Sequence, residues 1–293
     1  LPGLLAREGF TTGMIAGNVY LSANFGMNRD WGHHEVDMFP PANQVTDRAL
    51  AWLDQHQGQD ALLQVHYMSA HLPYLEPEPF RSTFAGDGPP GMGGEFHLPA
   101  VRSAERNGTL DDAGKAYIAD RYDNCVLWID HELQRLYERL QPEDILVFYS
   151  DHGEEFWDHG GYEHGHTLYD ELLHVPLVIK APGLTPGRVT EPVSLLDVTP
   201  TLLSLLGIQA DQQGTDLVPA AKGEPEALKQ LASRVQAVGR PLYGRERWGV
   251  LKDGFKWTSH EGDESVYDLG IDPFEHDDLS AKTDLTPYRK ALG

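Results

Sequence analysis

The stretch SDHGEEFWDHGGYEHGHTLYDELLHVPLVIKAPG, residues 150–183, places five histidines and seven carboxylates directly after an apolar run. That run, ILVFYS (residues 145–150), is rich in aliphatic and aromatic residues, which predicts a buried strand. Asp151 and His152 therefore lie where a strand ends, and Gly153 lets the backbone turn there. A carboxylate oxygen and a neutral imidazole nitrogen both suit a divalent cation, so this strand end is a candidate metal site.

The same two residues also have a structural interpretation, in which Asp151 caps the loop and His152 is a buried histidine with satisfied hydrogen bonds. The surrounding sequence favours chemistry over this alternative. His159, His164 and His166 follow within one loop, and a purely structural loop has little use for three more imidazoles. The sequence contains no G-x-S-x-G, phosphate-loop or G-x-G-x-x-G motif, so a serine esterase or a nucleotide enzyme is poorly supported.

Other apolar segments extend the pattern to an α/β fold. ALLQVHYM (residues 61–68) and PLVIKA (residues 176–181) predict two more strands, and a long helical pattern separates the first of them from residues 145–150. Strands separated by helices indicate an α/β sandwich around a mainly parallel sheet, whose ligands bind beyond the carboxyl ends of the strands. We expect Cys125, on that helix, to be a small buried hydrophobe and not a catalytic thiol. The apolar stripe expected to face the core is Tyr122, Val126, Ile129, Leu133, Leu136 and Leu140.

The pattern of the sequence changes after Gly239, where short aromatic pieces are separated by KDG and EGD turns. This alternation predicts a small antiparallel sheet. We therefore expect an α/β domain over residues 1–239 and a small β-rich subdomain over residues 240–293, packed on the main core through Trp248 and Trp257.

The charge of the chain limits its partners. Acidic residues outnumber Lys and Arg by 45 to 23, a formal net charge of -22, which argues against nucleic acid and anionic membranes as partners. The most apolar segment, residues 193–208, is interrupted by Asp197 and Pro200, so we predict no membrane span. A polyanionic substrate would need locally positive groups.

Four stretches, in this order along the chain, resemble the sulfatase family within the alkaline phosphatase superfamily. VHYMSAHLPYLEPEPF (residues 65–80) resembles the family segment that ends in a histidine, a proline and an aromatic residue. The stretch from residue 150 resembles the carboxyl-terminal signature. VSLLDVTPTLLSLLGI (residues 193–208) resembles the D-x-x-P-T helix, and VYDLGIDPFEHDDLS (residues 266–280) resembles the closing L-Y-D-L-x-x-D-P motif.

The resemblance implies an alkaline-phosphatase-like α/β sandwich and assigns roles to matching positions. Asp151 and His152 inherit the metal-binding role, toward one divalent ion that is calcium, zinc or manganese. His71 inherits the substrate-facing position. The family has a basic residue that contacts the ester oxygens or the leaving group, and two histidines are candidates for it here. His164 is preferred, by its similarity to lipid-A phosphoethanolamine transferases, and His166 is the second candidate, assigned to substrate binding.

One departure from the family pattern concerns the nucleophile. Sulfatases carry it in a C-x-P-x-R or S-x-P-x-R segment, and no such segment occurs in this sequence. The first residues resemble the helix and strand that follow the nucleophile, so the chain resembles the carboxyl-terminal part of a longer enzyme, and we expect it to be inactive alone. Cys125, in NCVLW, does not match the modified cysteine of the family.

Three functions remain open on this evidence. The leading hypothesis is a metal-dependent hydrolase of sulfate monoesters, acting on an anionic small molecule or glycan ester. The second is a phosphoryl or phosphonate monoester hydrolase, or a phosphoethanolamine-type transferase, because the imidazole of His152 suits zinc or manganese better than calcium. The third is a noncatalytic, sulfatase-like chain that binds metal or a partner. In each case we expect His159 to orient the loop.

Overall fold

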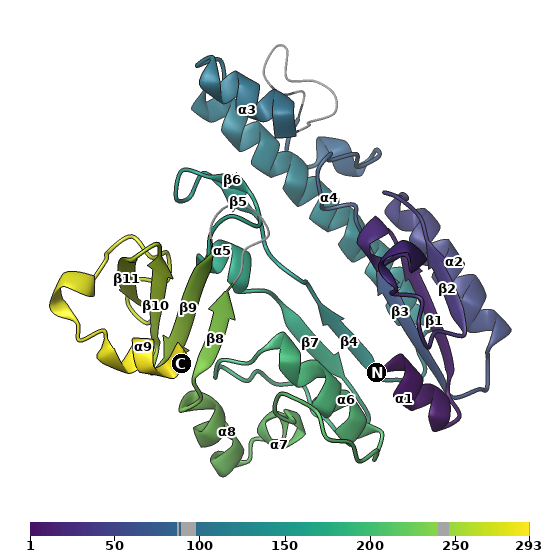
Figure 1. Ribbon diagram of the computed structural model, residues 1–293. Helices are drawn as coiled ribbons and strands as arrows, with labels where there is room; N and C mark the ends of the chain where they lie inside the picture. The colour runs from purple at the N-terminus through teal and green to yellow at the C-terminus, as the bar shows by residue number, and fades with distance from the viewer. Residues whose placement is uncertain (87, 89–97, 240–245, 293) are drawn as a thin grey trace. The chain divides into compact units, whose positions relative to one another are not determined.

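The computed structural model describes residues 1–86, 88, 98–239 and 246–292. The chain forms two compact units, Leu1–Gln141 and Pro142–Gly293 (Figure 1). The first unit contains α1 (Pro2–Arg7), β1 (Thr11–Ala16), β2 (His33–Val36), α2 (Ala42–Gln55), β3 (Ala61–His66), α3 (Leu98–Arg106) and α4 (Asp112–Arg139). None of the described helices is long and apolar enough to cross a membrane.

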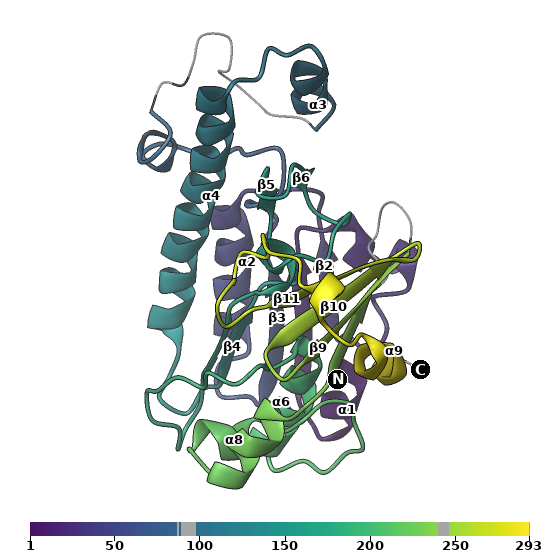
Figure 2. The ribbon, with the colours of Figure 1, turned by 90° about the vertical axis from the view of Figure 1, so that its left-hand side faces the viewer.

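The sheet of the first unit is parallel, with strand order β2-β1-β3. Helix α2 packs against it and against α4, as Figures 1 and 2 show. Ile15 on β1 and Trp52 on α2 belong to the buried cluster between sheet and helix. Gly13 on β1 permits this packing, because a Cβ atom there would lie 2.7 Å from the Trp52 ring. The predicted strand over residues 61–68 is β3.

Helix α4 covers the predicted helical segment, but the predicted buried face is only partly right: Leu136 packs against the core cluster of the first unit, whereas Val126 does not lie in the core. Val126 is 43% exposed, whereas Arg121, Cys125 and Trp128 are buried. The reason is a buried carboxylate from another segment: Glu76 forms an ion pair with Arg121 and accepts a hydrogen bond from Cys125. Polar residues therefore occupy the core face, which apolar periodicity does not reveal. Cys125 is buried as expected, and burial raises the pKa of its thiol.

The second unit contains the remaining strands and helices. The two predicted strands here are β4 and β7, which pair with each other in the antiparallel sense. The elements are β4 (Leu146–Tyr149), β5 (Glu155–Phe156), β6 (Tyr162–Glu163), α5 (Asp170–Leu173), β7 (Leu177–Lys180), α6 (Val198–Leu205), α7 (Val218–Ala221), α8 (Pro225–Ala232), β8 (Gln236–Gly239), β9 (Arg247–Lys252), β10 (Phe255–His260), β11 (Asp263–Asp268) and α9 (Thr286–Leu292).

The last strands form a four-stranded antiparallel sheet in the order β11-β10-β9-β8. Val250, Trp257 and Val266 lie opposite one another on neighbouring strands and form a buried cluster with Tyr288 of α9. Trp257 therefore packs under the sheet's own helix, and the expectation that it joins the sheet to the main core is wrong. Trp248 packs against the same cluster.

The predicted fold is confirmed in its main features: an α/β chain with a parallel sheet and a small C-terminal antiparallel sheet. The boundary after Gly239 stays a prediction. Strand β8 joins the C-terminal sheet from residues on its N-terminal side, Gln236–Gly239.

Candidate functional site

Strand β4 delivers Asp151 and His152 to the start of the histidine-rich loop. The Ser150 hydroxyl donates a hydrogen bond to the His152 carbonyl oxygen at 2.6 Å, and the Asp151 carboxylate accepts one from the His152 amide at 3.2 Å. His152 Nδ1 lies 2.8 Å from the Gly153 carbonyl oxygen. A carbonyl only accepts, so Nδ1 carries the hydrogen, and Nε2 carries the lone pair of the neutral ring.

Gly153 is required at this position by close packing. Its amide donates to the Leu172 carbonyl at 2.9 Å, and a Cβ atom would lie 2.0 Å from the Glu171 carbonyl oxygen. The sequence suggested a sharp turn at this glycine, whereas the structure shows a close approach between the loop and α5. The strand end is thereby held against the helix that follows the histidines.

The hairpin β5–β6 brings His164 back beside His152. The centroids of the two imidazole rings are 3.9 Å apart and their planes are tilted by 30°. His164 Nδ1 lies 2.7 Å from Oε1 of Glu154, a buried carboxylate from the same loop. The structure thus brings together Asp151, His152 and His164, three of the residues that the sequence proposes for the site.

The charge state of His164 follows from this geometry. Burial by itself lowers the pKa of His164, but the hydrogen bond and negative charge of Glu154 outweigh it and raise the pKa above its ordinary value. Glu154 therefore favours the imidazolium form and fixes the ring orientation.

His166 contacts a different carboxylate. Its Nε2 lies 3.0 Å from Oε2 of Glu155, a fully buried residue whose Oε1 accepts a hydrogen bond from the Gly161 amide at 2.6 Å. The hydrogen bond to Glu155 raises the pKa of His166, against the opposing effect of burial. A Cβ atom at Gly161 would come within 2.4 Å of His166 Nε2 and 2.7 Å of the Glu155 carboxylate, so another residue there would displace this pair. The substrate-binding role of His166 stays a prediction.

His159 occupies the structural position that we expect from the sequence. Its Nδ1 lies 2.8 Å from Glu171 Oε1, and its Nε2 lies 3.3 Å from the Glu275 carbonyl oxygen. The ring stacks on Tyr169, with centroids 3.5 Å apart and planes at 7°. Burial lowers the pKa of His159, but Glu171 raises it further, so the net shift is upward. His159 therefore links the loop to α5 and to the segment after β11.

A buried ion-pair network supports the same region from the C-terminal sheet. Lys256 on β10 is fully buried, with Nζ 2.7 Å from Asp170 Oδ1 and 2.6 Å from Glu275 Oε2. Glu275 Oε2 also accepts from the Asp170 amide at 2.6 Å. Asp170 is the first residue of α5, so Lys256 and Glu275 anchor the helix on which the loop packs.

His71, the other proposed site residue, belongs to the first unit. Its Nδ1 lies 2.7 Å from the Leu72 carbonyl oxygen, and its ring meets Phe39 edge to face with centroids 5.6 Å apart. It lies five residues after the end of β3, in a loop at the carboxyl end of a parallel strand. That position agrees with the general location of ligand sites in parallel sheets.

The donor set at the strand end fits a divalent cation. The side chain of Asp151 is 62% exposed and that of His152 is 40% exposed, with Asp151 Oδ1 and His152 Nε2 3.9 Å apart. One carboxylate and one imidazole whose Nδ1 is fixed by a carbonyl form a normal pair of ligands for zinc or manganese.

Sequence reasoning missed the carboxylates that hold the histidines. Glu154 and Glu155 follow the predicted metal-binding pair after one glycine, and each of them contacts a different histidine. The signal was present as two adjacent acidic residues in a histidine-rich loop. Lys256 and Glu275 gave no comparable signal, because the pairing joins residues on separate strands and loops.

Comparison with known proteins matches residues 1–208 to the sequence model of the family described as Sulfatase. A sulfatase of Formosa agariphila is 27% identical over 278 residues, which cover 85% of this chain and 52% of the relative. An arylsulfatase of Clostridium perfringens is 25% identical over 299 residues, which cover 92% of this chain and 59% of the relative. The solved structure of a 2-O GAG sulfatase has the same fold, with a TM-score of 0.68 at 19% identity over 99% of this chain and 71% of that one. The chain spans about half the length of the curated relatives it matches.

Proposed function

The chain belongs to the sulfatase family. From that premise we propose that its function is the hydrolysis of sulfate monoesters. The observation that carries the proposal is the pairing of His164 with Glu154 beside the ring of His152. This arrangement offers a proton donor next to a pair of metal ligands. Both are needed for cleavage of an anionic ester with a poor leaving group.

Asp151 and His152 are the residues we propose to hold a divalent ion. When bound, such an ion supplies positive charge that polarises the ester. The choice among calcium, zinc and manganese depends on the donor set, and the imidazole of His152 favours zinc or manganese over calcium, which prefers oxygen ligands.

His164 is proposed to donate a proton to the departing oxygen. Glu154 keeps the ring oriented and favours its charged form, so that the imidazolium both attracts the anionic ester and protonates the leaving group. His71 is proposed as the second substrate-facing imidazole, and His166 as an additional binding residue positioned by Glu155. We propose no catalytic task for His159, since both of its ring nitrogens contact structural partners.

The test compares leaving groups in the full-length protein. His71→Ala and His164→Ala should each lower kcat/KM by roughly 10²- to 10⁴-fold for sulfate esters with basic leaving groups. The loss should be much smaller for activated aryl sulfates, whose phenolate needs little protonation. His159→Ala is the matched control, and it should lower stability and activity together without any dependence on the leaving group. Equal losses for both substrate types in the His164 variant would remove the general-acid role.

A phosphoryl or phosphonate monoester hydrolase, or a phosphoethanolamine-type transferase, is the second candidate, and the imidazole of His152 is the observation that favours it. The sulfate and phosphate monoesters of one phenol separate the two proposals, because the leaving group is constant. A higher kcat/KM for the sulfate ester supports the first proposal. Turnover of neither ester, with metal still bound, would indicate the noncatalytic alternative.

The proposed substrate is an anionic small molecule or a glycan ester. The charge of -22 makes the imidazoles of the loop an important local source of positive charge for such a ligand. The structurally similar 2-O GAG sulfatase is consistent with a glycan.

A further inference from the structure

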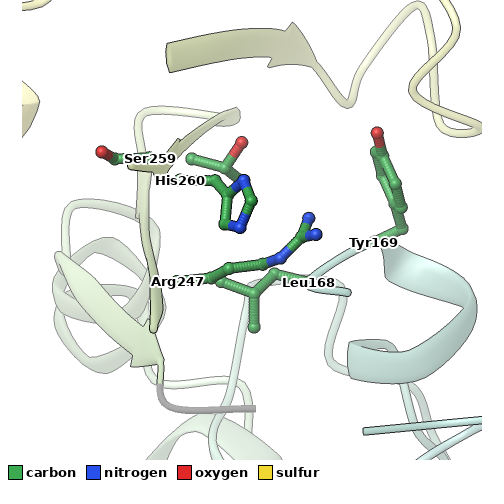
Figure 3. Close-up of a pocket in the computed structure, with 6 residues that line it drawn as sticks. Leu168, Tyr169, Arg247, Ser259 and His260 are labelled. Carbon is green, nitrogen blue, oxygen red and sulfur yellow. The ribbon is translucent and has the colours of Figure 1, made fainter. Parts of the chain in front are cut away.

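A small pocket that contains several polar side chains lies on the C-terminal sheet next to the histidine-rich loop. It is lined by Leu168, Tyr169, Arg247, Thr258, Ser259 and His260. Figure 3 shows the guanidinium of Arg247 and the ring of His260 side by side, with Tyr169 across from them. The lining thus combines one permanent cation, one ionisable imidazole and hydroxyl groups.

Strand register explains why the two basic side chains meet. Arg247 on β9 and His260 on β10 are direct partners in the antiparallel ladder. Directly opposite residues project from the same face of a sheet with Cβ atoms about 4.5–5.5 Å apart. Two basic groups at this spacing repel each other when both are charged. Asp263 on β11, the partner of His260 on its other side, places a carboxylate next to the imidazole and not next to Arg247, so an anion beside Arg247 would stabilise the pair further.

Arg247 differs from the other partly buried arginines of the chain. In the portion that the structure describes, it is the one arginine outside the exposed class that contacts no carboxylate. The other arginines of this kind, all of them in ion pairs, are Arg48, Arg121, Arg135, Arg139 and Arg234. In a protein with 45 acidic residues, a half-buried guanidinium without such a partner indicates a ligand of negative charge.

We propose that this pocket binds a second anionic group of the substrate, a carboxylate or a sulfate that is not the one hydrolysed. The inference rests on the proposed function, because it assigns the pocket to the substrate of the same site. Arg247 would supply a bidentate contact, and His260 and Thr258 would supply further donors.

The pocket is connected to the candidate site through a short segment. Leu168 and Tyr169 are the second and third residues after His166 in the loop, and Leu168 lies near Gly249 of β9. His164 and Tyr169 are five residues apart, so their Cα atoms lie within about 18 Å of each other. A ligand that occupies both places carries two anionic groups, the ester at the candidate site and a second group at the pocket, as an acidic oligosaccharide does.

The kinetic test uses the full-length enzyme and two sulfated disaccharides that differ only in a uronic acid or a neutral sugar beside the sulfated ring. The measured quantity is the ratio of kcat/KM for the acidic over the neutral substrate. Arg247→Gln should lower this ratio roughly tenfold or more, mainly through KM. Arg247→Lys should lower it less, and Arg188→Gln, which changes an exposed arginine elsewhere in the second unit, should leave it unchanged. An unchanged ratio in Arg247→Gln would overturn the proposal.

A binding test does not depend on catalysis. The ring signals of His260 in the 293-residue chain, assigned with His260→Gln, are followed by NMR during titration with glucuronate, with inorganic sulfate and with glucose, at constant pH. A saturable shift with either anion that disappears in Arg247→Gln supports the site and identifies the preferred anion. A shift that persists in Arg247→Gln, or the absence of any shift, rules the site out. Binding by the 293-residue chain, together with no sulfate ester hydrolysis by the full-length enzyme in the kinetic test, would contradict the proposed function and leave the anion site standing.

Discussion

Replacement of Lys256 by methionine tests whether the C-terminal sheet holds the histidine-rich loop in place. Methionine keeps most of the apolar stem and removes the ammonium group. Glu275 would then retain the Asp170 amide as its contact at Oε2, while its Oε1 has no hydrogen-bond partner among the described residues. Removing one member of a buried ion pair costs about 3–5 kcal/mol, because the other charge stays buried.

The loss has an upper limit set by protonation of Glu275. Burial already raises the pKa of Glu275 in spite of the opposing effect of Lys256, so the carboxyl takes up a proton once the lysine is removed. At pH 7, holding it protonated against an ordinary pKa of 4.5 costs about 3.4 kcal/mol, at 1.36 kcal/mol per unit. At pH 5 the same cost is about 0.7 kcal/mol. We therefore expect Lys256→Met to lower the free energy of unfolding by about 3 kcal/mol at pH 7 and by much less at pH 5.

The sign follows from linkage. A carboxyl whose folded pKa is raised binds its proton more tightly in the folded state, so the folded state loses stability as pH rises from the unfolded pKa through the folded one. Urea unfolding followed by tryptophan fluorescence measures the loss, since Trp257 lies on the adjacent position of β10. Lys252→Met, on the neighbouring strand with an exposed partner, is the control and should leave the midpoint unchanged. A loss below about 1 kcal/mol at pH 7, or an equal loss at both pH values, would refute the reasoning.

Three further predictions concern the site and its support. The 293-residue chain should bind zinc or manganese weakly, because Asp151 and one imidazole leave most coordination positions to water, and Asp151→Ala should abolish the binding. A calorimetric titration that shows tight, stoichiometric metal binding would contradict this. Glu154→Gln should lower the pKa of His164, as measured by NMR of the ring, since it removes the charge that raises it; an unchanged titration would show that Glu154 is not the cause. Burial raises the pKa of Asp197, but Arg234 lowers it by more, so the net shift is downward. This carboxylate therefore stabilises the fold above pH 3.8 and loses its effect as the pH falls through the lowered pKa. Asp197→Asn should weaken the fall of the unfolding free energy at acidic pH.

The sequence predicts those features that depend on local pattern. Strand β4 follows from the apolar run just before Asp151, and the antiparallel sheet follows from turn-separated aromatic pieces. The metal-binding role of Asp151 and His152 stays a prediction. The buried face of α4 could not be predicted in the same way. It is defined by Glu76, which lies 45 positions before Arg121 and makes a polar residue the favourable one in the core. Long-range ion pairs leave no periodicity in either partner's own segment.

The orientation of the histidines also depends on features that are not local. Glu154 and His164 meet because β5 and β6 form a hairpin, in which Glu163 adopts a φ of 78° that residues other than glycine rarely adopt. A sequence can show that imidazoles and carboxylates are close along the chain. It does not show which pairs form, because that depends on which direction each side chain takes in the folded loop.

The alternation of side chains along β10 joins the support of the site to the proposed anion pocket. Lys256, Thr258 and His260 share one face of the strand, and Trp257 lies on the other face, where it packs under α9. The first face contacts α5 through Asp170 and lines the pocket with Arg247. Packing on α9 fixes the register of the sheet, because a slip by one residue would place Lys256 among apolar side chains. Mutations that disrupt the cluster of Val250, Trp257, Val266 and Tyr288 should therefore displace both the histidine-rich loop and the pocket.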